Sequence, residues 1–183
     1  MKVLVLSDIH YPNCNIDEIK NIIEGEKPDK IVLLGDIANC KDCYNIIISI
    51  IKNYSNEIEI ICGDNEKKFN INCYKYLIID KILIYHGDNI NLISEFFTKI
   101  IAKIFYKISR SLLKEIVSFL VKSNRYTIVI GHSHLLGKSR LFNVYFAGTL
   151  CKKHYFLERG YIVIKDGKIF IKKLDKPPGA AGI

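Results

Sequence analysis

The sequence predicts a single-domain α/β sandwich, and three observations lead to this fold class. Short apolar runs recur along the chain and fit strands buried in a sheet. Helical patterns separate the first three runs, whereas the later runs follow one another, which is typical of an α/β sandwich with a mixed second sheet. With 183 residues, of which 49% are hydrophobic and 25% charged, the chain can bury a sizeable core. We expect one domain over residues 1–176 and a flexible Pro- and Gly-rich tail at 177–183.

The first third of the chain alternates strands with helices. Each expected strand is a run of aliphatic residues, and each expected helix shows apolar residues at helical spacing behind a capping residue. The expected elements are a strand at 3–6, a helix at 16–23 with Asn15 as its cap and Gly25 at its end, a strand at 30–34, a helix at 46–51 with Asp42 as its cap, and a strand at 58–62.

The remaining elements are mostly strands. A hairpin is expected around Asp80 and Lys81. The later strands are expected at 126–130, 144–147, 161–165 and 168–174. Between the hairpin and the strand at 126–130, two amphipathic helical segments are expected over about 90–123, with lysines on the polar face of the first.

Five of the apolar strands end in Asp or His, four of them beside a Gly that permits a tight turn. Since open α/β sheets bind ligands at the carboxyl ends of their strands, we expect these side chains to converge. In near-extended backbone Asp8 and His10 project to the same side. Carboxylates with imidazoles suit divalent ions, and a set of this size suffices for two metals that share a carboxylate. The set is Asp8, His10, Asp36, Asp64, His86, His132 and His134.

At these positions the sequence resembles the calcineurin-like metallophosphoesterases, especially their small bacterial and archaeal phosphodiesterases. The resemblance is carried by Asp8-x-His10, Gly35-Asp36-x-x-Asn39, Gly63-Asp64-x-Glu66, His86-Gly87 and Gly131-His132-Ser133-His134. It implies a four-layer α/β/β/α sandwich, with the segment at about 90–123 as a helical insertion. It also implies that two divalent ions are bound, Mn²⁺ first among Ni²⁺, Fe²⁺, Zn²⁺ and Co²⁺.

The resemblance further implies a role for each residue. Asp8, His10 and His134 would hold one metal, and Asp64, His86 and His132 the other. Asp36 would bridge the two ions, and Asn39 would support the ligands from outside the set. A hydroxide between the metals would attack phosphorus in line.

The third motif departs from the usual Gly-Asn-His-Asp/Glu. Asp64 can still bind a metal, although its charge weakens the attraction for phosphate. Asn65 stands where many members carry a His that protonates the leaving group, and an amide is no general acid near neutral pH. We therefore assign Asn65 to the catalytic position and expect a phosphodiesterase acting on small diesters with good leaving groups.

Three other functions remain open. A hydrolase of lipid-linked pyrophosphates, like the UDP-2,3-diacylglucosamine hydrolases, would use Asp88 and the helical insertion. A non-catalytic scaffold is a second alternative, because the retromer subunit with this fold also has Gly-Asp in the third motif. A nuclease would fit the net charge of +8. However, no separate basic domain is evident, and we do not expect nucleic acid as a partner.

Two further expectations concern partners and compartment. The amphipathic segment 92–122 could contact a membrane surface, an acyl chain or a second copy of the chain. The absence of a signal peptide or membrane span predicts a cytoplasmic protein with mostly reduced cysteines. Cys40 and Cys43 have redox or metal spacing; we expect incidental thiols, with a disulfide or metal role as alternatives.

Overall fold

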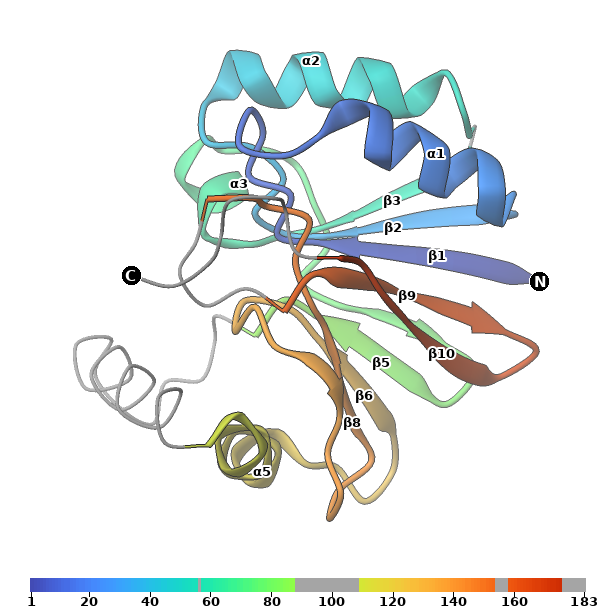
Figure 1. Cartoon of the computed structure of the whole chain (residues 1–183), viewed down its shortest axis with the longest axis vertical. Helices are drawn as coiled ribbons and strands as arrows, with labels where there is room; N and C mark the ends of the chain where they lie inside the picture. The colour runs from blue at the N-terminus through green and yellow to red at the C-terminus, as the bar shows by residue number, and fades with distance from the viewer. Residues whose placement is uncertain (56, 88–108, 154–157, 176–183) are drawn as a thin grey trace.

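A computed structural model of the chain describes residues 1–55, 57–87, 109–153 and 158–175. Two five-stranded sheets pack face to face, and helices lie on their outer faces, α1 and α2 above and α5 below (Figure 1). The predicted α/β/β/α sandwich is therefore confirmed. The first segment of the expected insertion, up to residue 108, and the expected tail at 177–183 lie outside the described residues.

Both sheets are mixed. The parallel strands occupy the centre of the second sheet and extend from the centre to one edge of the first. The first has the order β10 (Lys168–Lys173), β9 (Gly160–Lys165), β1 (Lys2–Ser7), β2 (Lys30–Leu34) and β3 (Ile58–Ile61). The second has the order β4 (Leu77–Ile79), β5 (Ile82–Tyr85), β6 (Thr127–Ile130), β8 (Val144–Ala147) and β7 (Leu136–Lys138). Strands β1, β2 and β3 run parallel, as do β5, β6 and β8. Their carboxyl ends consequently lie on one side of each sheet.

Three apolar clusters join the layers, because alternate residues of a strand face opposite sides of its sheet. Leu4 and Leu6 of β1 pack against the helices α1 (Ile16–Glu26) and α2 (Lys41–Lys52), which cover the first sheet. Val3 and Val5 face the second sheet instead. On the far side of that sheet, the helix α5 (Arg110–Val121) contributes Leu113 to the third cluster.

Nearly all predicted strands appear within one residue of their expected bounds, whereas the helix ends differ. α1 ends at Glu26 and not at Gly25, and Lys27 caps it in the left-handed conformation. α2 is capped by Cys40, whose sulfur accepts the Cys43 N–H, and not by Asp42. The sequence did not predict the short helix α3 (Asp64–Lys68) or β7. Among the described residues, no helix is long and apolar enough to cross a bilayer.

The expectation of mostly reduced cysteines is wrong, because four of the six form disulfides. Cys40 pairs with Cys43, and Cys62 pairs with Cys73. Both bonds need a spatial closeness that residue spacing alone does not reveal. The cytoplasmic localisation, which is inferred from the lack of a signal peptide and membrane span, stays a prediction.

Candidate metal centre

Six of the seven predicted ligands form two groups at the carboxyl ends of the central parallel strands. Within each group, the potential ligand atoms lie within 4.8 Å of one another. The first group is Asp8, His10 and His134, and the second is Asp36, His86 and His132. These ligands come from both sheets. Some lie in the loops after β1 and β2 of the first sheet, and the others lie in the loops after β5 and β6 of the second sheet.

The first group is centred on the Asp8 carboxylate, which is fully buried. Its Oδ1 lies 3.2 Å from His134 Nε2 and 3.8 Å from His10 Nε2. Its Oδ2 accepts hydrogen bonds from the Ser7 hydroxyl and the His132 backbone N–H. One carboxylate oxygen is thus held by the protein while the other faces two imidazoles.

Asp36 connects the two groups. Its Oδ2 lies 3.6 Å from His86 Nε2 in the second group and 3.9 Å from His10 Nε2 in the first. Its Oδ1 accepts a hydrogen bond from the backbone N–H of Asn65, 3.0 Å away. A carboxylate oxygen between two sets of imidazoles is the arrangement expected of a bridging ligand.

Two of the histidines, His86 and His10, are oriented by partners on their Nδ1 atoms. His86 Nδ1 lies 2.8 Å from the Leu34 carbonyl, and His10 Nδ1 lies 3.0 Å from the Asn39 side-chain oxygen. Asn39 also donates to the His10 carbonyl. In both residues Nε2 is directed at a carboxylate. A partner on Nδ1 of this kind fixes the tautomer of metal-binding histidines.

The backbone at these residues is unusual. Five of the seven predicted ligands adopt left-handed dihedral angles, with φ between 50° and 59°: Asp8, His10, Asp36, His132 and His134. Such residues are uncommon outside glycine and cluster at functional sites. Asp8 and His10 therefore converge because two tight bends follow β1, and not because the backbone is extended as the sequence suggested.

Glu66 supports the site in a way that the sequence analysis missed. Its buried carboxylate accepts three backbone N–H groups, from Asp36 at 2.8 Å and from Ile37 and Gly63 at 2.9 Å. The spacing of Gly63 and Glu66 matches a capping box and could have indicated this role. Burial raises the pKa of Glu66, and the three N–H groups oppose that shift.

The charges within the cluster are strongly coupled. Burial alone would raise the pKa of Asp8, but the imidazoles of His134 and His86 outweigh it and lower the pKa. His86 in the same way lowers the pKa of Asp36 against the effect of burial. Burial disfavours the imidazolium of His86, yet the Asp36 and Asp8 carboxylates raise the pKa of His86 to about 9.

The donor set fits divalent metal ions. Asp8 Oδ1 and His86 Nε2 are buried and make no hydrogen bond to any residue within the described ranges. Buried polar atoms almost always have partners, so atoms of this kind facing a shared space call for a ligand or ion. Mixed carboxylate and imidazole donors are those that Mn²⁺, Fe²⁺ and Zn²⁺ use.

Asp64 and Asn65 lie at the edge of this cluster, at the start of α3. The Asp64 side chain is 58% exposed, and its Oδ2 lies 3.8 Å from His132 Nδ1. It stands outside both groups of closely spaced ligand atoms. Asn65 is half-buried and contacts Asp36 through its backbone N–H.

Comparison with known families agrees with the geometry. The calcineurin-like phosphoesterase superfamily domain matches residues 1–165. The chain belongs to this superfamily. No curated protein matches the sequence.

Solved structures of this superfamily fold are similar to the chain over nearly its whole length. A Vps29 mutant from Entamoeba histolytica is 14% identical, with a TM-score of 0.57, over 96% of this chain and 99% of that one. A phosphoesterase from E. coli, YfcE, is 12% identical, with a TM-score of 0.54, over 92% and 91%. An archaeal phosphodiesterase is 16% identical, with a TM-score of 0.54, over 95% and 100%. At these identities the likeness establishes the fold.

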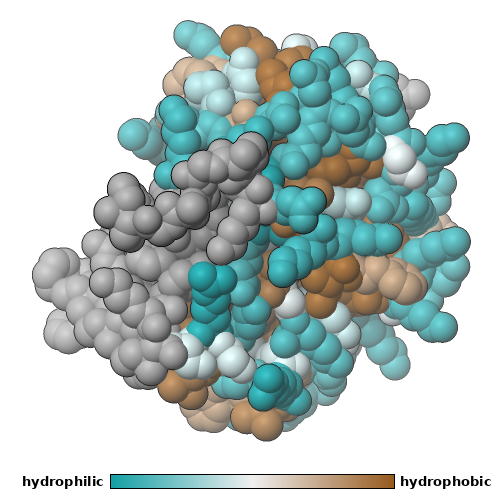
Figure 2. Space-filling view, viewed as in Figure 1, coloured by the Kyte–Doolittle hydropathy of each residue, from teal (hydrophilic) through white to brown (hydrophobic). Residues whose placement is uncertain are grey.

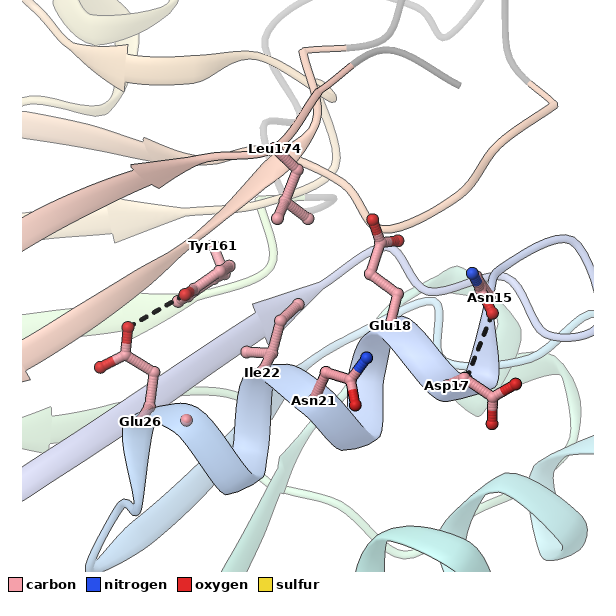
Figure 3. A pocket seen from close by; sticks show the side chains of 9 residues that line it. Asn15, Asp17, Glu18, Asn21, Ile22, Glu26, Tyr161 and Leu174 are labelled. Carbon is pink, nitrogen blue, oxygen red and sulfur yellow. Dashed lines mark hydrogen bonds between the residues drawn. The ribbon is translucent and has the colours of Figure 1, made fainter. Parts of the chain in front are cut away.

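This phosphoesterase domain also has a groove of about 630 Å³ along α1, and none of the candidate ligands lines it (Figure 3). Leu174 and Tyr161 line its opposite side. Its carboxylates already have partners, since Glu26 accepts a hydrogen bond from the Tyr161 hydroxyl and Glu18 pairs with Arg159. We assign the chemistry to the paired ligand groups and not to this larger groove.

Proposed function

We propose that the protein is a divalent-metal-dependent phosphodiesterase. The observation that carries the proposal is the pair of ligand groups joined by Asp36, with buried atoms of Asp8 and His86 facing the shared space. A structural role for these polar residues would require hydrogen-bond partners for those atoms. Membership of the phosphoesterase superfamily supports the same reaction class.

Each residue has a role in this proposal. Asp8, His10 and His134 would hold one ion, His86 and His132 with the exposed Asp64 the other, and Asp36 would contact both. When bound, two divalent ions stabilise negative charge on a phosphoryl group and lower the pKa of water. The protein holds the ligands in place: the Leu34 carbonyl orients His86, Asn39 orients His10, and Ser7 fixes one oxygen of Asp8.

The preference for diesters rests on Asn65. Its backbone N–H orients Asp36, while its amide side chain can donate a hydrogen bond but cannot transfer a proton near neutral pH. Substrates with good leaving groups do not require such a transfer. We therefore propose small diesters as substrates, Mn²⁺ as the metal to supply first, and a cytoplasmic enzyme.

The first test compares bis-p-nitrophenyl phosphate with p-nitrophenyl phosphate, with Mn²⁺ and with chelator, while metal content is measured. We expect diester cleavage that depends on the metal, with little monoester cleavage. Equal cleavage of both substrates would contradict the interpretation of Asn65. Failure to bind any divalent ion would contradict the proposal as a whole.

A variant pair isolates the bridging carboxylate. Asp36→Ala should reduce diester cleavage more than about 100-fold, beyond the loss typical of residues that merely support metal ligands. Asp42→Ala removes an exposed carboxylate from α2 and should leave cleavage unchanged. Retained activity in Asp36→Ala would refute the shared-ligand geometry.

A non-catalytic scaffold is the second candidate, because the candidate acid position is Asn65 and Asp64 lies outside the compact ligand groups. It would bind metal without turning over diesters, monoesters or lipid-linked pyrophosphates. A stable protein partner together with that result would favour the scaffold over the enzyme.

A further inference from the structure

The solvent-facing side of α5 is apolar, although α5 lies at the outside of the molecule (Figure 1). Phe119 is 58% exposed, Leu112 45% and Leu120 37%. Beside the helix, in the turn after β7, Leu141 is 73% exposed. Hydrophobic atoms accordingly reach the surface at the lower edge of the molecule, where α5 lies (Figure 2). We call Leu112, Phe119, Leu120 and Leu141 the α5 face.

The α5 face is not needed to attach the helix. Leu113 and Val117, on the other side of α5, pack against the second sheet. The Lys114 ammonium donates to the Leu136 carbonyl and pairs with Glu158 at 2.8 Å. Glu115 accepts hydrogen bonds from the turn that carries Leu141. The helix is therefore anchored through its inner side and one edge. On its outer side, the Phe119 ring contacts the edge of the Phe142 ring, 6.1 Å between ring centres, and the rest of the Phe119 side chain is exposed.

Positive charge lies beside the α5 face, although Glu158 pairs with two of the nearby cations, Arg110 and Lys114. Residues 109–145 contain six Lys or Arg and one acid, a formal charge of +5 out of the +8 of the whole chain. The Lys122 ammonium lies 4.3 Å from the centre of the Phe119 ring, so a cation stands directly beside an exposed aromatic side chain. The one acid, Glu115, is already engaged by the Ser139 hydroxyl and by backbone N–H groups. The six cations are Arg110, Lys114, Lys122, Arg125, Lys138 and Arg140.

We propose that the α5 face docks onto an anionic lipid surface. Exposed Phe and Leu side chains bordered by Lys and Arg are the features of helices that lie in a membrane interface. A second copy of the chain would bring the same cations against one another, which disfavours a symmetric dimer through this face. Nucleic acid would match the charge but would leave Phe119 and Leu141 without an apolar environment.

The test measures sedimentation of the full chain with vesicles. Vesicles of phosphatidylcholine with about one-third phosphatidylglycerol should bind the protein, and pure phosphatidylcholine should bind it much more weakly. Salt at about 1 M should weaken binding, because it shortens the range of charge attraction to about 3 Å. Equal binding to both kinds of vesicle, or none to either, would overturn the proposal.

Variants separate this surface from the rest of the molecule. Phe119→Ser with Leu141→Ser should weaken binding to anionic vesicles at least about tenfold, because two apolar anchors are lost. Phe170→Ser removes an exposed aromatic from β10 of the first sheet and should leave binding unchanged. Unchanged binding in the double variant would refute the assignment.

Two control measurements complete the design. Hydrolysis of a soluble diester should be the same in the double variant as in the parent, so failure of the proposed reaction and failure of docking remain distinguishable. A fall in Tm of more than about 2–4 °C in Leu141→Ser would show that the protein itself covers the α5 face, and would overturn the proposal. A dimer that disappears in the double variant would assign the face to a second copy instead.

Discussion

Replacing Glu66 by Ala should both destabilise the protein and weaken metal binding. The Glu66 carboxylate joins two segments, because it accepts N–H groups from Asp36 and Ile37 after β2 and from Gly63 after β3. It is completely buried, so water cannot replace it in the folded protein. The backbone that carries the proposed bridging ligand therefore depends on a side chain thirty residues further along the chain.

The size of the effect follows from the groups left without partners. A buried donor deprived of its acceptor costs about 1–3 kcal/mol. Three donors share one carboxylate and relax together, so we expect a loss of about 3–5 kcal/mol in the free energy of unfolding. Since Asp36 loses its positioning, metal affinity should also fall by about 10–100-fold, as for other residues that orient ligands.

Urea unfolding of the metal-free protein measures the first quantity, and calorimetric titration with Mn²⁺ measures the second. Glu24→Ala, an exposed position on α1, is the matched control and should change neither. Glu66→Gln keeps the shape of the side chain but turns an amide N–H toward a backbone N–H. Its free energy of unfolding and its metal affinity should therefore lie between those of the parent and those of Glu66→Ala. A loss below about 1 kcal/mol in Glu66→Ala would refute the reasoning, because a single unsatisfied donor already costs that much.

Three further outcomes are expected. Gly35→Ala should disrupt the site, because Gly35 has φ of +70° and a Cβ there would lie 2.7 Å from the Cγ of His86. In the control Gly25→Ala, the new Cβ meets no atom within 4 Å, and the free energy of unfolding should rise by about 0.5–1 kcal/mol in urea titrations. Metal binding near neutral pH should release protons and tighten as the pH rises toward 9, because below its pKa of about 9 His86 holds a proton that a metal must displace; titrations in buffers of different ionisation enthalpy measure this release. Replacing both Cys62 and Cys73 by Ser should lower the free energy of unfolding by about 3 kcal/mol, as expected for a loop of this length, and unchanged urea midpoints would argue against the bond.

The strands could be predicted because each is a continuous apolar run whose burial does not depend on the details of its neighbours. β2 and β8 have the predicted bounds, since aliphatic residues begin and end where the sheet does. β7 could not be predicted in this way: it has three residues, one of them Gly137, and exists through its pairing with β8. Short elements of this kind depend on tertiary contacts, which a local pattern does not contain.

The candidate ligands could be predicted for a related reason. Polar residues at the ends of neighbouring parallel strands must meet if the strands are placed correctly, and six of the seven do. The contributions of Glu66 and of the Cys62–Cys73 bond depend instead on the path of the loops between strands. Those paths follow from hydrogen bonds and packing between residues distant in sequence.

The left-handed backbone at the candidate ligands is held by the surrounding structure. Each left-handed residue costs about 1–3 kcal/mol and persists only where the surrounding structure enforces it. Asp8 illustrates how this is done: its backbone N–H donates to the Gly35 carbonyl, its own carbonyl accepts the Thr149 hydroxyl, and its carboxylate accepts the Ser7 hydroxyl. The Thr149 hydroxyl comes from the loop after β8 in the second sheet, so both sheets must be in place before the bend at Asp8 is stable. The strain at the ligands is thus sustained by the sandwich itself, which directs buried carboxylate and imidazole atoms at one another.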